Sequence, residues 1–103
     1  MDYDRKVMAD LERSLRDSRP YYQAATYYLE TGRDLNQALV WFDRAIEQNP
    51  KAYWVYHQKA NALAKLGRKD EARKTAQISM DLAREQQNDD YVKLNEKLIA
   101  SLR

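Results

Sequence analysis

The chain lacks cysteine, and its 103 residues include only two glycines and two prolines. Without cysteine there is neither a disulfide framework nor a thiolate for catalysis or metal binding. The scarcity of glycine and proline argues against a β-rich or a disordered chain. No apolar run approaches the roughly 20 residues of a membrane span. The charged N-terminus MDYDRKVMAD does not have the pattern of a signal peptide either.

An excess of charge of one sign is also missing, because 18 basic and 16 acidic residues leave a net charge of +2. This balance does not favour nucleic acid or an anionic membrane as a partner. What the chain does contain is 44% hydrophobic and 33% charged residues, which suits a folded domain with a solvated surface. We therefore expect one small domain over residues 1–103, and no strand pattern appears in it.

Apolar residues recur at three- and four-residue steps, which predicts amphipathic helices. The clearest case is the segment 34–48, where Ala38, Phe42 and Ala45 share one face and Asn49-Pro50 ends the helix. Short connections make neighbouring helices antiparallel. The same pattern predicts about six helices, at 4–15, 19–31, 34–48, 52–66, 69–87 and 89–102.

The predicted core combines large side chains with small residues at close helix contacts. Its large members are Tyr28, Leu39, Phe42, Ile46, Tyr56, Leu63 and Met80. The last helix is expected to turn inward Tyr91, Leu94, Leu98 and Leu102. Asn95 stands at a position where a small residue is usual and where a following helix would pack. Its polar side chain therefore predicts that this helix is a solvated cap at the end of the array. Trp41 is expected either to face outward on the convex side or to cover the first helix.

Two segments of the chain repeat at a period near 34 residues, which is typical of helical solenoids. Ala38 and Ala72 are 34 residues apart, and Gly32 and Gly67 are 35 apart. The order of aromatic, small, large apolar, glycine and alanine resembles the tetratricopeptide repeat over residues 18–86. The first repeat supplies Tyr21, Ala24, Ala25, Tyr28, Gly32, Ala38, Phe42, Ala45 and Pro50. The second supplies Tyr56, Ala60, Leu63, Gly67, Ala72, Ala76 and Ser79.

This resemblance implies an all-α, right-handed superhelix of antiparallel helix pairs. Residues 1–17 would form an N-terminal helix, 18–52 and 53–87 the two repeats, and 88–103 a capping helix. Arg84 stands where the first repeat has its proline, so the helix over 69–87 is expected to run on. The runs YYLETGRDLNQALVWFDRAIEQNP, KANALAKLGRKDEA and NDDYVKLNEKLIASL are also similar to the C-terminal part of a bacterial exported family of unknown function. That likeness implies an exported or periplasmic parent protein and adds no activity.

By the same resemblance, a concave groove is lined by the second, fifth and ninth positions of each first helix. These positions hold Arg19, Tyr22, Thr26, Trp54, His57, Asn61, Asp89, Val92 and Glu96. Tyrosine and tryptophan offer large contact areas, and asparagine both donates and accepts hydrogen bonds. The alternative is that Tyr22 and Trp54 lie along seams between helices and bind nothing. A clamp for a C-terminal carboxylate is disfavoured, since Tyr22 and His57 stand where such clamps have lysine.

No constellation of catalytic residues is found. His57 is the only histidine, so a metal site or a catalytic base would lack convergent partners. Asp89 and Asp90 are explained by capping and by the helix dipole. We expect a non-catalytic module that binds a protein or peptide segment, with no cofactor, metal, nucleic acid or membrane. The alternative is a structural domain that supports a larger protein or forms a homodimer.

Overall fold

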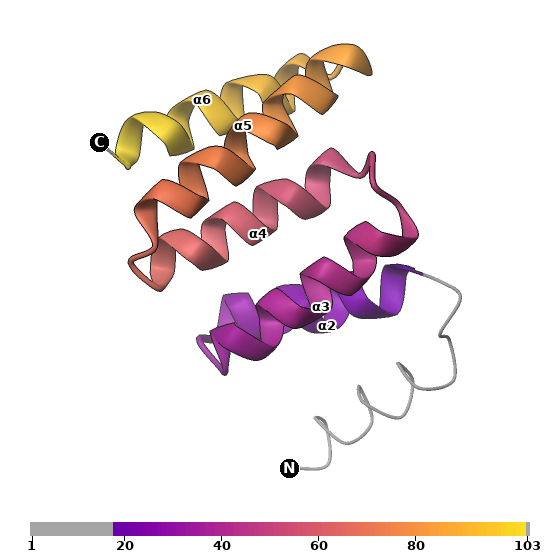
Figure 1. Ribbon diagram of the computed structural model, residues 1–103, viewed down its shortest axis with the longest axis vertical. Helices are drawn as coiled ribbons and strands as arrows, with labels where there is room; N and C mark the ends of the chain where they lie inside the picture. The colour runs from indigo at the N-terminus through magenta and orange to yellow at the C-terminus, as the bar shows by residue number, and fades with distance from the viewer. Residues whose placement is uncertain (1–17, 103) are drawn as a thin grey trace. The chain divides into compact units, whose positions relative to one another are not determined.

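The computed structural model describes residues 18–102, with side chains from Tyr21 onward. Within this range the chain is all-α and contains no strand (Figure 1). Its helices are α2 (Ser18–Thr31), α3 (Leu35–Gln48), α4 (Tyr53–Lys65), α5 (Lys69–Glu85) and α6 (Asp89–Ser101). The predicted bounds of these five helices are confirmed to within two residues. The helix predicted at 4–15 lies outside the described residues.

The chain divides into two compact units, residues 1–50 and 51–103. The first unit contains α2 and α3, and the second contains α4, α5 and α6. This division falls two residues before the repeat boundary predicted between residues 52 and 53. The arrangement as a single domain, with repeats at 18–52 and 53–87 and a cap at 88–103, stays a prediction.

In the first unit, α2 and α3 form a hairpin whose turn is fixed by local hydrogen bonds. Gly32 takes a left-handed backbone conformation, with φ of 69°, which lets Arg33 N donate to Tyr28 O at 3.0 Å. The Asp34 carboxylate then accepts from the backbone N–H groups of Asn36 and Gln37 at 3.1 and 3.2 Å. These bonds satisfy backbone groups that helix ends leave without partners.

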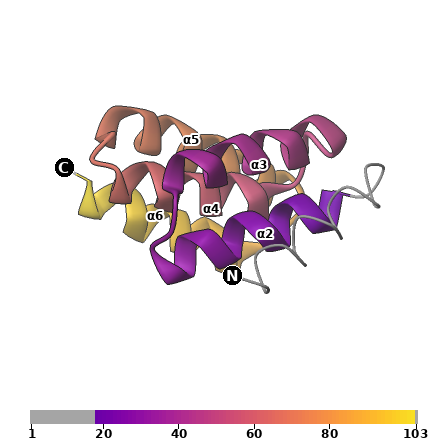
Figure 2. The same cartoon turned by 90° about the horizontal axis from the view of Figure 1, so that it is seen from below.

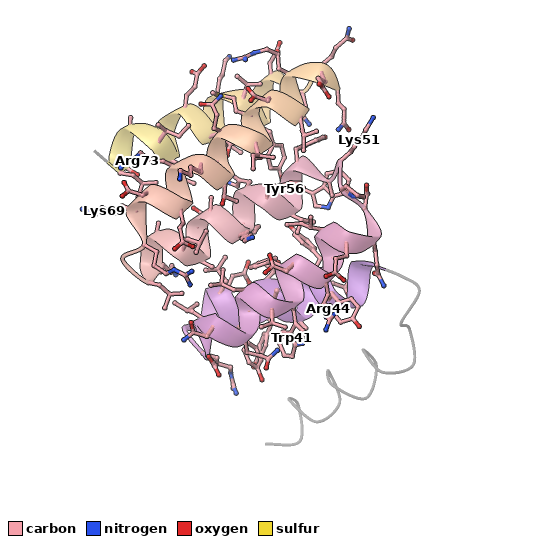
Figure 3. All side chains as sticks on the ribbon, viewed as in Figure 1. Trp41, Arg44, Lys51, Tyr56, Lys69 and Arg73 are labelled. Atoms are coloured by element: carbon pink, nitrogen blue, oxygen red, sulfur yellow. The ribbon has the colours of Figure 1, made fainter. Side chains whose placement is uncertain are left out.

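The interior of this hairpin follows the predicted face of α3, because Ala38, Phe42 and Ala45 are all fully buried. Trp41 is buried as well, at 4% exposure. Its ring lies edge-on to Tyr28 of α2, with the centroids 4.8 Å apart. Of the two positions predicted for Trp41, the outward one is wrong and the other is confirmed, because the indole covers α2, the first helix of the hairpin (Figure 3).

In the second unit, α5 packs against both α4 and α6, and those two helices lie on the same side of α5 (Figure 2). The α4–α5 and α5–α6 connections contain the same backbone hydrogen bond as the α2–α3 turn, from an N–H to the carbonyl five residues earlier. Arg68 N donates to Leu63 O at 2.9 Å after Gly67, and Asn88 N donates to Ala83 O at 2.8 Å after Gln87. As predicted, α5 runs on past the position where α3 ends, and it stops only at Glu85.

Small residues again occupy the close contacts between these helices, and Ala60, Ala72, Ala76, Ser79 and Ala83 are fully buried. Of the large residues predicted for the core, some are buried, namely Leu39, Phe42, Leu63 and Met80. The others are half-buried, namely Tyr28, Ile46 and Tyr56.

The inward face of α6 differs from the predicted one. Leu94 is 45% exposed, whereas Asn95 is 0% exposed. The inward stripe therefore runs through Tyr91, Asn95, Leu98 and Leu102, and Leu94 lies about 100° away from Asn95 around the helix. The predictions of an inward Leu94 and a solvated Asn95 are both wrong. The reason is that partners on α4 and α5 satisfy the Asn95 amide.

Candidate functional site

The groove candidates of α2 are partly engaged in packing. The Tyr22 ring is half-buried and meets Phe42 of α3 edge-on, with centroids 6.3 Å apart. Thr26 is half-buried, and its Oγ1 is the one buried side-chain polar atom without a hydrogen-bond partner among residues 21–102. The side chain of Arg19 lies outside the described residues. Tyr22 thus fits the alternative of a seam between helices as well as it fits a groove.

The α4 candidates, Trp54, His57 and Asn61, are all half-buried. The Trp54 ring stands nearly perpendicular to that of Tyr53, with centroids 5.0 Å apart. Asn61 Nδ2 donates to Gln58 Oε1 at 3.1 Å on the same helix. These side chains are restrained by neighbours and still keep part of their surface in contact with solvent.

The α6 candidates differ in exposure, since Asp89 and Glu96 are exposed and Val92 is half-buried. Asp89 lies in the first turn of α6, where its charge complements the helix dipole. Because α4 and α6 lie on the same side of α5 (Figure 2), the candidates of these two helices belong to one layer of the second unit. We call them the α4–α6 face, comprising Trp54, His57, Asn61, Asp89, Val92 and Glu96.

Aromatic contacts join the two helices of this layer. The Tyr91 ring of α6 lies 5.0 Å from the ring of Tyr53 and 5.6 Å from that of His57, edge-on in both cases. The Tyr53 hydroxyl also accepts a 2.8 Å hydrogen bond from Asn88 Nδ2. These contacts join α4 to α6.

A chain of polar groups runs through all three helices of the second unit. His57 Nδ1 lies 2.7 Å from Asn95 Oδ1. Asn95 Nδ2 donates to Ser79 Oγ at 2.8 Å and to Tyr91 O at 2.9 Å. Ser79 Oγ in turn donates to Tyr53 O at 2.6 Å. A buried amide that lacked these partners would be costly, and with them Asn95 can sit in the interior.

Sequence reasoning placed His57 in the groove and missed Asn95 as its partner. A signal was present in the repeat itself. Ser79 stands 34 residues after Ala45, and Asn95 stands 35 residues after Ala60. Two alanine positions of the repeat thus carry polar residues, and the structure brings those two residues together.

The comparison with known families bears on the same region. A family model described as a tetratricopeptide repeat matches residues 41–74. This match supports a tetratricopeptide repeat over that part of the chain. The match begins at Trp41 in α3, spans α4 and ends at Lys74 in α5. No curated protein matches the chain. The likeness to an exported bacterial family therefore stays a prediction.

Tetratricopeptide repeats are protein-interaction modules in general, and the antiparallel helix pairs of this chain have that architecture. Two of the basic residues at the start of α5, Arg68 and Arg73, are paired with carboxylates. Arg68 donates to both carboxylate oxygens of Glu71, at 3.2 and 2.6 Å. Arg73 pairs with Asp70 and donates to Leu102 O at 2.6 Å, at the end of α6 (Figure 3).

Within residues 18–102, no group of three or more His, Cys, Asp or Glu side chains could hold a metal ion. None of the helices between Ser18 and Ser101 combines the length and the apolar character that crossing a bilayer requires.

Proposed function

We propose that the chain is a non-catalytic module that binds an extended protein or peptide segment along the α4–α6 face. The observation that carries this proposal is that Trp54 and His57 are half-buried, so that each keeps some solvent-accessible surface, and that neighbouring side chains hold both in place. A side chain that is already fixed loses little conformational entropy when a partner binds. Such a face binds more tightly than one whose side chains must first be ordered.

The chemistry of the α4–α6 face suits a peptide. Trp54 offers aromatic area, the type of residue that dominates many interfaces. His57 and Asn61 offer hydrogen-bonding groups about one and about two helical turns further along α4, where they can meet successive polar groups of an extended backbone. The ring of His57 is paired with an amide rather than with a carboxylate or a nucleophile, which supports a binding role over a catalytic one.

The test is selection of peptides from a random display library on the full chain, followed by affinity measurement. Trp54→Ala should weaken the selected peptides by tenfold or more, since a central aromatic contributes about 2 kcal/mol or more. Val40→Ala is the matched control, because Val40 is an exposed apolar residue of α3 and should bind like the parent chain. If no sequence is enriched, or if Trp54→Ala binds as well as Val40→Ala, the proposal is wrong.

A homodimer is the second candidate, and the exposure of two large apolar side chains of the second unit favours it. Ile78 of α5 is 46% exposed, close to the value for Leu94 of α6. Light scattering across a concentration series tests this candidate, with Leu94→Glu as the disrupting variant. A mass that stays monomeric at every concentration would eliminate it.

A further inference from the structure

The polar chain of the second unit has a direction that two backbone carbonyls determine. A carbonyl oxygen only accepts hydrogen bonds. Ser79 Oγ lies 2.6 Å from Tyr53 O, so the hydroxyl proton of Ser79 points to that carbonyl. The Ser79 oxygen is then left to accept from Asn95, which lies 2.8 Å away.

The orientation of the Asn95 amide follows in the same way. The Asn95 atom that lies 2.9 Å from Tyr91 O faces an acceptor, so it must be the amide nitrogen. Its two protons are directed to Tyr91 O and Ser79 Oγ. The remaining amide atom, Oδ1, is an acceptor and lies 2.7 Å from His57 Nδ1. A hydrogen bond at this distance requires a proton on Nδ1.

We propose that Asn95 holds neutral His57 in the tautomer protonated on Nδ1, so that its Nε2 accepts a hydrogen bond from the bound segment. This inference rests on the proposed function. His57 is half-buried and bonds through Nδ1. Within residues 21–102 the only buried side-chain polar atom without a partner is Thr26 Oγ1. Nε2 is therefore on the solvent side of the ring.

The partner that fits this position is a segment with an N–H or O–H donor opposite His57. A backbone N–H of an extended peptide meets that requirement, and so does a serine, threonine or lysine side chain. A bare carbonyl or carboxylate does not, because it would face the lone pair of Nε2. Asn95 acts as a positioning residue, since it does not need to touch the partner.

The first test is the nitrogen NMR spectrum of the full chain at about pH 9, where imidazole side chains are neutral. His57 is the only histidine, so its two ring nitrogens give one isolated pattern. We expect a pyrrole-type shift for Nδ1 and a pyridine-type shift for Nε2. Free imidazole side chains favour the opposite tautomer, so a pyridine-type Nδ1 would overturn the proposal directly.

Two variants separate the positioning role from a merely structural one. Asn95→Leu removes the acceptor, and its His57 should revert to the tautomer protonated on Nε2. In Ser79→Ala, Tyr91 O still orients the Asn95 amide, so the Nδ1-protonated form should persist. Backbone amide spectra establish that each variant is folded. If Asn95→Leu does not fold, the spectrum of the parent chain alone decides the tautomer.

The second test uses a peptide obtained by the display selection, with its backbone amides methylated one at a time and its side-chain donors replaced. One of these changes should weaken binding to the parent chain roughly fivefold to tenfold, the effect of one neutral hydrogen bond. The same change should have no effect on His57→Leu. The absence of such coupling at every position would refute the role of Nε2. If no peptide is selected, that role fails together with the proposed function, while the nitrogen shifts still decide the tautomer.

Discussion

The side-chain amide of Asn88 performs two functions at the start of α6. Its Nδ2 donates a 2.8 Å hydrogen bond to the Tyr53 hydroxyl. Its Oδ1 accepts a 3.3 Å hydrogen bond from Tyr91 N, which caps the helix. One side chain thus caps the N-terminus of α6 and links the first turn of α6 to the first turn of α4. Because different atoms are involved, the two functions can be removed separately.

Replacement of Asn88 should show both contributions. Asn88→Ala removes the cap and the link to Tyr53, and we expect it to lower the free energy of unfolding by about 1–2 kcal/mol. Asn88→Ser keeps a capping oxygen and is too short to reach Tyr53, so it should cost about half as much. Urea denaturation followed by circular dichroism measures both. Equal losses for the two variants would contradict the capping role.

A stabilising change is expected at Gln87. This residue has φ of 59°, in the region that Gly32 and Gly67 occupy at the ends of α2 and α4. Side chains other than glycine are strained there by about 1–2 kcal/mol, so Gln87→Gly should raise the free energy of unfolding by about 0.5–1 kcal/mol. Gln86→Gly is the control, because Gln86 has φ of −93° and gains nothing. A lower melting temperature for Gln87→Gly than for Gln86→Gly would refute this account.

Overfilling the small-residue contacts should destabilise each unit. Ala38 and Ala72 are fully buried, and Ala38→Leu or Ala72→Leu should cost about 1–3 kcal/mol because the neighbouring helices must move apart. Ala100→Leu is the matched control, since Ala100 is exposed on α6. Thermal melting compares the three variants. Unchanged melting of Ala38→Leu or Ala72→Leu would count against these close contacts.

Truncation of Phe42 should have the largest effect in the first unit. Its ring is fully buried and is met edge-on by Tyr22. Phe42→Ala removes that ring and leaves a cavity, with an expected loss of about 3–5 kcal/mol. Val40→Ala, two residues away on the exposed side of α3, should change stability by less than about 0.5 kcal/mol. Similar unfolding midpoints for the two variants would exclude Phe42 as the core of this hairpin.

Much of the helical framework was predictable from the sequence because the signals that define it are local. Gly32 and Gly67 end their helices in the left-handed conformation, and Asp34 and Asn88 cap the helices that follow. Each of these devices acts within a few residues of chain. The repeat period then placed the small residues at the helix contacts, where they are buried.

The inward face of α6 and the position of Trp41 could not be decided from the sequence, because they depend on contacts between residues far apart in the chain. On α6, a stripe through Leu94 and a stripe through Asn95 both have helical periodicity, and hydrophobicity favours the first. The second is realised because Ser79 and His57, 16 and 38 residues away, complete the hydrogen bonds of the amide. The sequence left two positions open for Trp41 for a similar reason, since its burial depends on the ring of Tyr28 across the hairpin. The groove candidates from Arg19 to Glu96 stay predictions.

The buried amide of Asn95 also determines how the helices of the second unit can be aligned. Alanine and leucine side chains tolerate a shift of one helix along another, because dispersion and burial are not directional. A shift of α6 by one turn would separate Asn95 from Ser79 on α5 and from His57 on α4 at once. The buried amide would then lose two of its three hydrogen bonds, at a cost of about 1–3 kcal/mol. In a chain whose helices resemble one another in sequence pattern, this polar contact distinguishes α6 from α4. It assigns α6 one position and one register against α5.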